Sequence, residues 1–159
     1  MYEIAVERHF CYGHRLINYD GPCKNLHGHN ARVLVTVLAK DLIAAGPKLD
    51  MVIDFKELKA ITDHEINKLD HKMILEHNVD PLEAMVSNVQ NMEGVVDRNE
   101  IVSFPARPTS ENIVRYLAVR IFRRLQVHVS SQKIHSLSVK MYETDANSVS
   151  YTMENDNAI

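Results

Sequence analysis

The chain has 159 residues, enough for one domain with a sizeable core, and a formal net charge of −3, which gives no reason to expect nucleic acid or an anionic membrane as a partner. No apolar run approaches the roughly 18 residues of a transmembrane helix, and the first residues lack the pattern of a secretory signal. The two cysteines are interpreted as thiols, so we expect a cytoplasmic protein with a single domain spanning residues 1–159.

Local patterns predict two strands and a helix in the first half of the chain. Apolar residues alternate over residues 2–10, and residues 31–38 are rich in β-branched side chains, so each segment is predicted to be a strand. Asp54 followed by Glu57 has the pattern of a capping box, and an apolar stripe at helical spacing continues to Leu69. A helix is therefore predicted to begin at Asp54.

The second half is predicted to hold two more helices and two more strands. One helix opens at Asp80 and stops near Gly94, and another begins around Thr109. Strands are predicted at 134–143 and 148–153. The order of strands, helices and strands favours an α+β fold, an antiparallel sheet with helices on one face. The cations on the polar side of the last helix are predicted to be solvated: Arg120, Arg123 and Arg124.

Three histidines form the first candidate site. His27 and His29 are separated by one residue, so both imidazoles project from the same side of an extended segment. His14 follows the first strand, where a hairpin return would bring it alongside. Three imidazoles leave a fourth zinc position open for water or substrate, as in catalytic zinc sites. Taken alone, the motif is also compatible with unrelated surface histidines, because short motifs often match by chance.

Several short segments, in the same order along the chain, resemble the 6-pyruvoyl-tetrahydropterin synthase and 6-carboxytetrahydropterin synthase superfamily. They are FCYGHRL at 10–16, CKNLHGH at 23–29, IDF at 53–55 with LK at 58–59, LDH at 69–71, PTSEN at 108–112 and YET at 142–144. The resemblance spans nearly the whole chain. It implies a tunnelling-fold (T-fold) subunit with a four-stranded antiparallel sheet. Members assemble into barrels, typically homohexamers built from two trimers, with active sites between subunits.

The resemblance also implies roles for individual residues. His14, His27 and His29 match the zinc ligands of the family, and Cys23 matches its catalytic cysteine. The alternative for Cys23 is a small buried hydrophobe, but it lies in a polar turn, where functional residues are more frequent than core residues. Cys11 lies where relatives usually carry another residue, and it is interpreted as structural.

Asp70 and His71 match the family's proton-transfer pair. The alternative is a histidine favoured by the dipole of the preceding helix, although the same dipole disfavours an aspartate there. Glu143 has the strand parity of apolar residues, so we expect its carboxylate to face the core and to bind the pterin ring rather than solvent. Thr109 and Ser110 are candidate pterin contacts and equally good helix N-caps.

The expected function is that of a zinc-dependent lyase acting on 7,8-dihydroneopterin triphosphate, without nucleic acid or membrane partners. Cys23 lies four residues before His27, which resembles the bacterial 6-carboxytetrahydropterin synthases of queuosine (7-deazapurine) biosynthesis. The alternatives are a 6-pyruvoyl-tetrahydropterin synthase and a non-catalytic, zinc-stabilised pterin-binding or assembly protein. The segment at about 72–107 is longer than in compact members, and we expect its helix at Asp80 and its run at 100–104 to pack outside the barrel.

Overall fold

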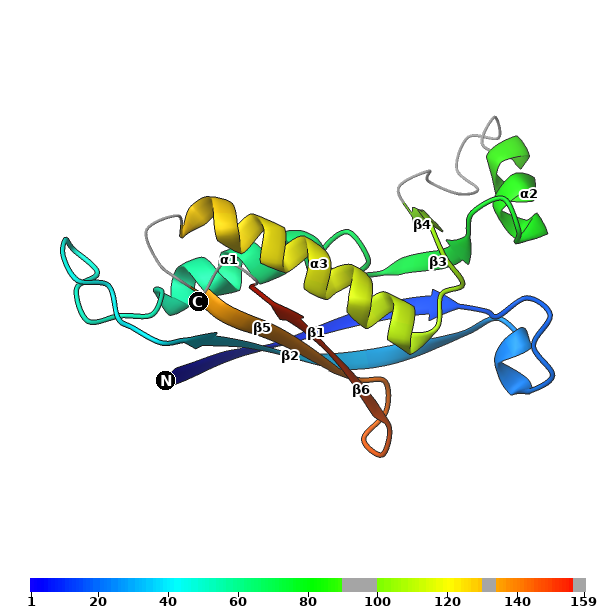
Figure 1. Cartoon of the computed structure of the whole chain (residues 1–159). Helices are drawn as coiled ribbons and strands as arrows, with labels where there is room; N and C mark the ends of the chain where they lie inside the picture. Colours follow the sequence, from blue (N-terminus) through cyan, green and yellow to red (C-terminus); the bar gives the residue numbers. More distant parts are fainter. Residues whose placement is uncertain (90–99, 130–133, 156–159) are drawn as a thin grey trace.

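The computed structural model describes residues 1–89, 100–129 and 134–155 (Figure 1). The strands are β1 (Tyr2–His14), β2 (His27–Ala39), β3 (Lys72–Glu76), β4 (Ile101–Phe104), β5 (Ile134–Tyr142) and β6 (Ser148–Glu154). The helices are α1 (Phe55–Ile66), α2 (Pro81–Val89) and α3 (Ser110–His128), with a short 3-10 turn, η1 (Pro22–Lys24). Helices α1 and α3 lie on one face of the sheet, as predicted (Figure 1). Within these three stretches, no helix combines the length and apolarity needed to cross a membrane.

The sheet has six strands, in the order β4-β3-β1-β2-β5-β6, and not the four that the family resemblance implies. The four predicted strands are present as β1, β2, β5 and β6, and each pairs with its neighbour in an antiparallel manner. The additional strands are parallel to their neighbours, β3 to β1 and β4 to β3, so the sheet is mixed. Both additional strands belong to the long segment at 72–107 and extend the sheet at its β1 side.

The strands β3 and β4 have five and four residues, too few for a periodic pattern. A short apolar run such as Met73–Leu75 cannot be distinguished from a buried piece of helix by periodicity. In the folded chain Ile74 and Leu75 are fully buried, and so is Phe104 at the end of β4. Helix α2 begins at Pro81 as predicted, whereas its predicted end near Gly94 lies outside the described residues.

The core lies between the sheet and the helices α1 and α3. In β2, every second residue from Ala31 to Ala39 is at most 1% exposed, the period-two pattern of a strand with one face covered. Helix α3 contributes the apolar stripe that helical spacing predicts: Ile113, Val114, Leu117, Ala118, Ile121, Phe122 and Leu125. The predicted N-caps are also confirmed. Asp54 accepts from the Lys56 amide at 2.7 Å, and Thr109 accepts from the Asn112 amide at 3.4 Å.

A buried carboxylate joins α1 to α3. Glu65 accepts hydrogen bonds from Lys68 at 2.7 Å, Arg120 at 2.6 Å and Arg124 at 3.0 Å. Burial alone would raise its pKa, but these three cations outweigh burial and lower the pKa of Glu65 to about 2. Arg123 is exposed, as the prediction of a solvated arginine face expects, whereas Arg120 and Arg124 are half-buried and paired with Glu65, which the sequence did not predict.

Candidate functional site

The alternation that builds the core also builds the candidate site. In β1, Tyr12 and His14 lie on the helix-covered face and are 3% and 2% exposed. In β2, His27 and His29 have the parity of the buried alternate residues and are themselves half-buried. The antiparallel register pairs His14 with His27 and Tyr12 with His29. The predicted hairpin return is confirmed, and the three imidazoles meet at the end of the core.

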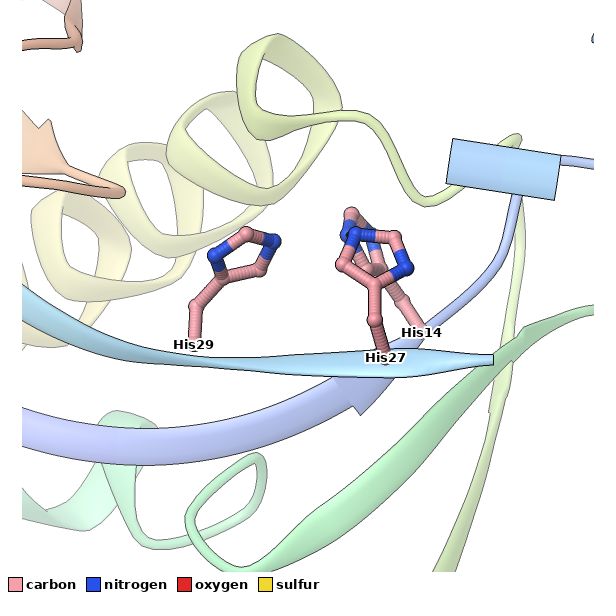
Figure 2. Close-up of side chains that lie close together, drawn as sticks. All are labelled: His14, His27 and His29. Carbon is pink, nitrogen blue, oxygen red and sulfur yellow. The ribbon is translucent and has the colours of Figure 1, made fainter. Parts of the chain in front are cut away.

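Figure 2 shows the three rings extending from β1 and β2 toward the side on which α3 lies. One nitrogen of each ring lies within 4.8 Å of those of the other two, and the Nε2 atoms of His14 and His27 are 3.1 Å apart. Two ligands of a tetrahedral zinc ion, each about 2.0–2.1 Å from the metal, lie roughly 3.3 Å from one another. The spacing therefore fits a zinc ion.

Backbone carbonyls hold the outer nitrogens of two rings. His14 Nδ1 is 2.7 Å from the carbonyl oxygen of Pro108, and His27 Nδ1 is 2.8 Å from that of Asn25. Because a carbonyl only accepts, each Nδ1 donates its proton and each Nε2 presents a lone pair to the site. The Nε2 of His29 is buried without a hydrogen-bond partner. Lone pairs that face one another repel, so this set of residues fits a cation, with the carbonyls as its outer shell.

Burial favours the neutral form of two of these imidazoles, those of His14 and His29. Burial lowers the pKa of His14, and the neighbouring His27 and His29 lower it further, although the carbonyl of Pro108 acts in the opposite direction. Burial also lowers the pKa of His29, against the carboxylate of Glu143. Both rings are therefore neutral at neutral pH, which is the form that binds a metal.

The Glu143 carboxylate follows β5 and faces the histidines, as strand parity predicts. Its Oε1 lies 3.5 Å from the Nε2 of His29. Ser110 donates to the same oxygen at 2.6 Å and the Tyr12 hydroxyl donates at 3.3 Å. Both donors use Oε1, and a carboxylate has about four lone-pair sites on its two oxygens, so acceptor capacity is left for a ligand. Thr109 contributes the cap of α3, which positions Ser110.

Cys23 lies in η1, within the loop that joins β1 to β2, and is a half-buried free thiol. Its carbonyl accepts from the Leu16 amide at 2.8 Å, which folds the loop back. Burial is the main cause that raises the pKa of Tyr12, followed by Glu143, and the charge of Cys23 adds to it. The thiol is not one of the three converging ligands.

Asp70 and His71 form a pair, but on the opposite face of the sheet. His71 Nδ1 lies 3.0 Å from Asp70 Oδ2, and Asp70 Oδ1 accepts from the Cys11 amide at 2.9 Å. Cys11 and His14 have opposite parity in β1, so they point to opposite faces. Within the described residues, no hydrogen bond or ion pair joins this pair to Cys23. The structure therefore brings Asp70 and His71 together as predicted, without a contact to the Cys23 thiol of the same chain.

Sequence reasoning missed the Tyr12 hydroxyl and the carbonyls of Asn25 and Pro108. The parity that Tyr12 shares with His14 was the available signal for the hydroxyl. Backbone carbonyls leave no signal in a pattern of side chains.

The sequence profile of the 6-pyruvoyl tetrahydropterin synthase family matches residues 3–154. The chain belongs to that family. The 6-carboxy-5,6,7,8-tetrahydropterin synthase of Haemophilus influenzae is 30% identical to this family member over 152 residues, 95% of this chain and 99% of the relative. The protein of the same name from Rickettsia conorii is 35% identical over 136 residues, 85% of this chain and 88% of the relative.

Solved structures show the same fold. A 6-pyruvoyltetrahydropterin synthase from Plasmodium vivax gives a TM-score of 0.73 at 21% identity, covering 97% of this chain and 98% of that one. An uncharacterized protein from Wolinella succinogenes gives a TM-score of 0.74 at 24% identity, covering 98% of each chain. The predicted T-fold family is therefore confirmed, with the correction to six strands.

Proposed function

We propose that this family member is a zinc-dependent lyase that converts 7,8-dihydroneopterin triphosphate to 6-carboxy-5,6,7,8-tetrahydropterin. The observation that carries the proposal is the meeting of a three-histidine metal site with the Glu143 carboxylate at one end of the core. Two relatives that match most of the chain bear the name of this enzyme. The position of Cys23 four residues before His27 is further support.

In this proposal, His14, His27 and His29 hold zinc and leave one position for the substrate. When bound, the metal would polarise the oxygens of the substrate's side chain and so make the adjacent C–H protons of the substrate more acidic. Glu143 anchors the pterin, whose N3–H and 2-amino group donate to its two oxygens. Ser110 fixes the orientation of that carboxylate through its bond to Oε1.

Cys23, Asp70 and His71 move the protons. Asp70 orients the imidazole of His71, and the imidazole exchanges a proton with the Cys23 thiol, which acts at the substrate. Since the pair lies on the sheet face opposite the metal ligands, we propose that a neighbouring subunit supplies it. The His71 side chain is 79% exposed and free to meet a neighbour. This arrangement requires a homo-oligomer, which we propose to be a hexamer built as a dimer of trimers.

The triphosphate needs cations near the metal site. Arg15 is paired with the buried carboxylate of Asp80, so its charge is already neutralised. Arg107 directly precedes Pro108 and donates to the carbonyl of Ile17 at 2.7 Å, in the loop that also carries Lys24. We propose Arg107 and Lys24 as the triphosphate contacts.

The proposal includes the cellular location of the enzyme and the pathway that uses its product. We place the enzyme in the cytoplasm, supported by its two free thiols, and its product in the biosynthesis of queuosine and other 7-deazapurines. Residues 1–159 act as one domain, since a single sheet and a single core hold the described elements.

Product analysis with 7,8-dihydroneopterin triphosphate tests the proposal. The carboxy product keeps one of the three side-chain carbons, so a two-carbon fragment must leave. The 6-pyruvoyl product of the alternative enzyme keeps all three. Mass spectrometry of the pterin and of the released fragment separates the two. A pyruvoyl pterin without a two-carbon fragment would establish the alternative, and an unchanged substrate would contradict both.

A second alternative is a metal-stabilised binding or assembly protein without turnover. Structural zinc sites are normally closed by four protein ligands, and Cys23 is the available fourth ligand. The absorption spectrum of cobalt bound to the three histidines shows whether Cys23 is a fourth ligand. A thiolate-to-cobalt band that disappears in Cys23→Ser would indicate a closed, structural site, whereas the proposed lyase shows no such band from Cys23.

A further inference from the structure

A second cluster of metal ligands lies on the sheet face opposite the histidines. One donor atom each from Cys11, Asp70 and His71 falls within 4.8 Å of the others. The Cys11 thiol also lies 3.0 Å from the amide oxygen of Asn30, its partner in the β1–β2 register. The cluster thus offers a sulfur, a ring nitrogen and carboxylate and amide oxygens.

The parallel pairing of β3 with β1 builds this cluster. The register places Tyr12 opposite Lys72, so the residues entering β3 lie beside Cys11. The Cys11 carbonyl accepts from the His71 amide at 2.6 Å, and the Cys11 amide donates to Asp70 Oδ1 at 2.9 Å. His71 has a φ of 55°, a left-handed conformation that is uncommon outside glycine, and these backbone contacts hold it there. The backbones that carry the Cys11 and His71 donors are therefore positioned by the fold.

The chemistry of these donors selects the kind of cation. Cysteine sulfur, histidine nitrogen and aspartate oxygen are the three side-chain ligands that zinc takes, in tetrahedral sites with about 2.0–2.3 Å bonds. Asp70 Oδ2 lies 3.0 Å from His71 Nδ1, close to the separation of two zinc ligands. The cluster is partly open to solvent, so a metal ion can enter without unfolding the chain.

We propose that Cys11, Asp70 and His71 form a second site for zinc or a similar divalent cation, and that a metal bound there inhibits the enzyme. The binding stands on the cluster alone. The inhibition rests on the proposed function, because the metal would occupy the pair that exchanges protons with Cys23.

Cobalt titration of the metal-free protein tests the binding. A thiolate-to-cobalt charge-transfer band should appear in the wild-type protein and in Cys23→Ser, and it should be absent from Cys11→Ser. In His71→Ala, the cobalt concentration needed for the band should rise at least about tenfold. No band in the wild-type protein, or a band that is lost with Cys23 and kept without Cys11, would overturn the second site.

Alkylation of the wild-type protein gives an answer that requires no folded variant. Zinc added beyond one equivalent per chain should slow the reaction of Cys11 with iodoacetamide, measured by mass spectrometry of the peptides, with the Cys11 rate at one equivalent as the reference. Equal rates for Cys11 with and without this added zinc would contradict the proposal. These two readouts need no turnover, so they decide the binding even where the proposed reaction fails.

Inhibition is measured by adding zinc beyond the amount that fills the three histidines. Turnover of the wild-type protein should fall with added zinc, and turnover of Cys11→Ser should stay constant over the same range. Equal inhibition of both proteins would show that zinc acts elsewhere and would remove the inhibitory role.

Discussion

Which nitrogen of each imidazole faces inward decides what the three histidines can do. The carbonyls of Pro108 and Asn25 take the Nδ1 protons of His14 and His27, and this leaves the Nε2 lone pairs directed at the metal position. The same carbonyls restrict rotation of the rings. The site is therefore preorganised by backbone atoms, and a substitution of any ring removes a ligand that its neighbours cannot replace.

We expect His27→Ala and His29→Ala each to lower zinc affinity by more than the 10–100-fold typical of losing an outer-shell partner, with loss of turnover. The measurement is the zinc content of purified protein after dialysis. His128→Ala is the matched control, since His128 is an exposed residue in the last turn of α3. Zinc retained by both motif variants would show that these residues are not the ligands.

Glu143→Gln should weaken pterin binding by about 2–4 kcal/mol, because one charge-assisted bond is lost and the amide nitrogen meets a pterin donor. The retained amide oxygen can still accept from Ser110 and Tyr12, so the zinc content and the fold should not change. Titration with a non-reactive pterin, such as biopterin, measures the loss. Ser110→Ala is the control and should cost only about 1 kcal/mol. Equal affinity of wild-type protein and Glu143→Gln would exclude Glu143 from the site.

Helices α1 and α3 are held together by ion pairs as well as by apolar contacts. Glu65 on α1 is 2% exposed, and its two oxygens are shared among Lys68, Arg120 and Arg124. A buried carboxylate without such partners would be costly, so removal of the charge leaves two arginines of α3 without their counter-ion. This connection sets the position of α3, whose first turn carries Ser110.

The pH dependence of stability follows from this carboxylate. The pKa of Glu65 is lowered from 4.5 to about 2, so its contribution to stability is complete above about 4.5 and is lost as the pH falls toward 2. We expect Glu65→Gln to lower the free energy of unfolding by about 2–3 kcal/mol at pH 7, and the difference from wild type to shrink below pH 4.5. Urea unfolding at pH 7 and at a pH below 4.5 measures this difference in the free energy of unfolding, with Arg123→Gln as the control. A difference that is independent of pH would contradict this role.

At the scale of the whole molecule, the sheet separates two halves of the proposed machinery. The metal ligands face the helices, and the Asp70–His71 pair lies on the other face. Within the described residues, no hydrogen bond or ion pair joins the pair to Cys23, which lies in the loop between β1 and β2. In the proposed homo-oligomer, each subunit can offer one face to a neighbour.

Mixing two inactive variants tests the shared site. Cys23→Ala and His71→Ala should each lose turnover by about 10²-fold or more, as for a deleted general acid or base. Co-expressed in equal amounts, they should regain about a quarter of the wild-type activity, since a random closed ring forms that share of intact sites between subunits. Mixed oligomers of Cys23→Ala with Cys23→Gly are the control and should stay inactive. Absence of recovery in mixed oligomers of confirmed composition would contradict a site between subunits.

The sequence by itself determined the elements and residues that depend on local periodicity. Alternation of apolar residues identified β1, β-branched composition identified β2, and a turn-rich segment separated β5 from β6. Strand parity directed His27, His29 and Glu143 to the covered face. Capping residues identified the starts of α1 and α3. These properties hold because the period of a strand or a helix is set by the backbone and not by distant contacts.

Only the tertiary structure decided what depends on pairing between distant segments. The short strands β3 and β4 carry too few residues for a periodic signal, and their parallel pairing beside β1 is what places His71 next to Cys11. Glu65 is separated from its partners on α3, Arg120 and Arg124, by 55 and 59 positions in the sequence. Strand parity fixes the face of each residue relative to its own strand, but which segment lies against that face follows from the closure of loops and the packing of the whole sheet.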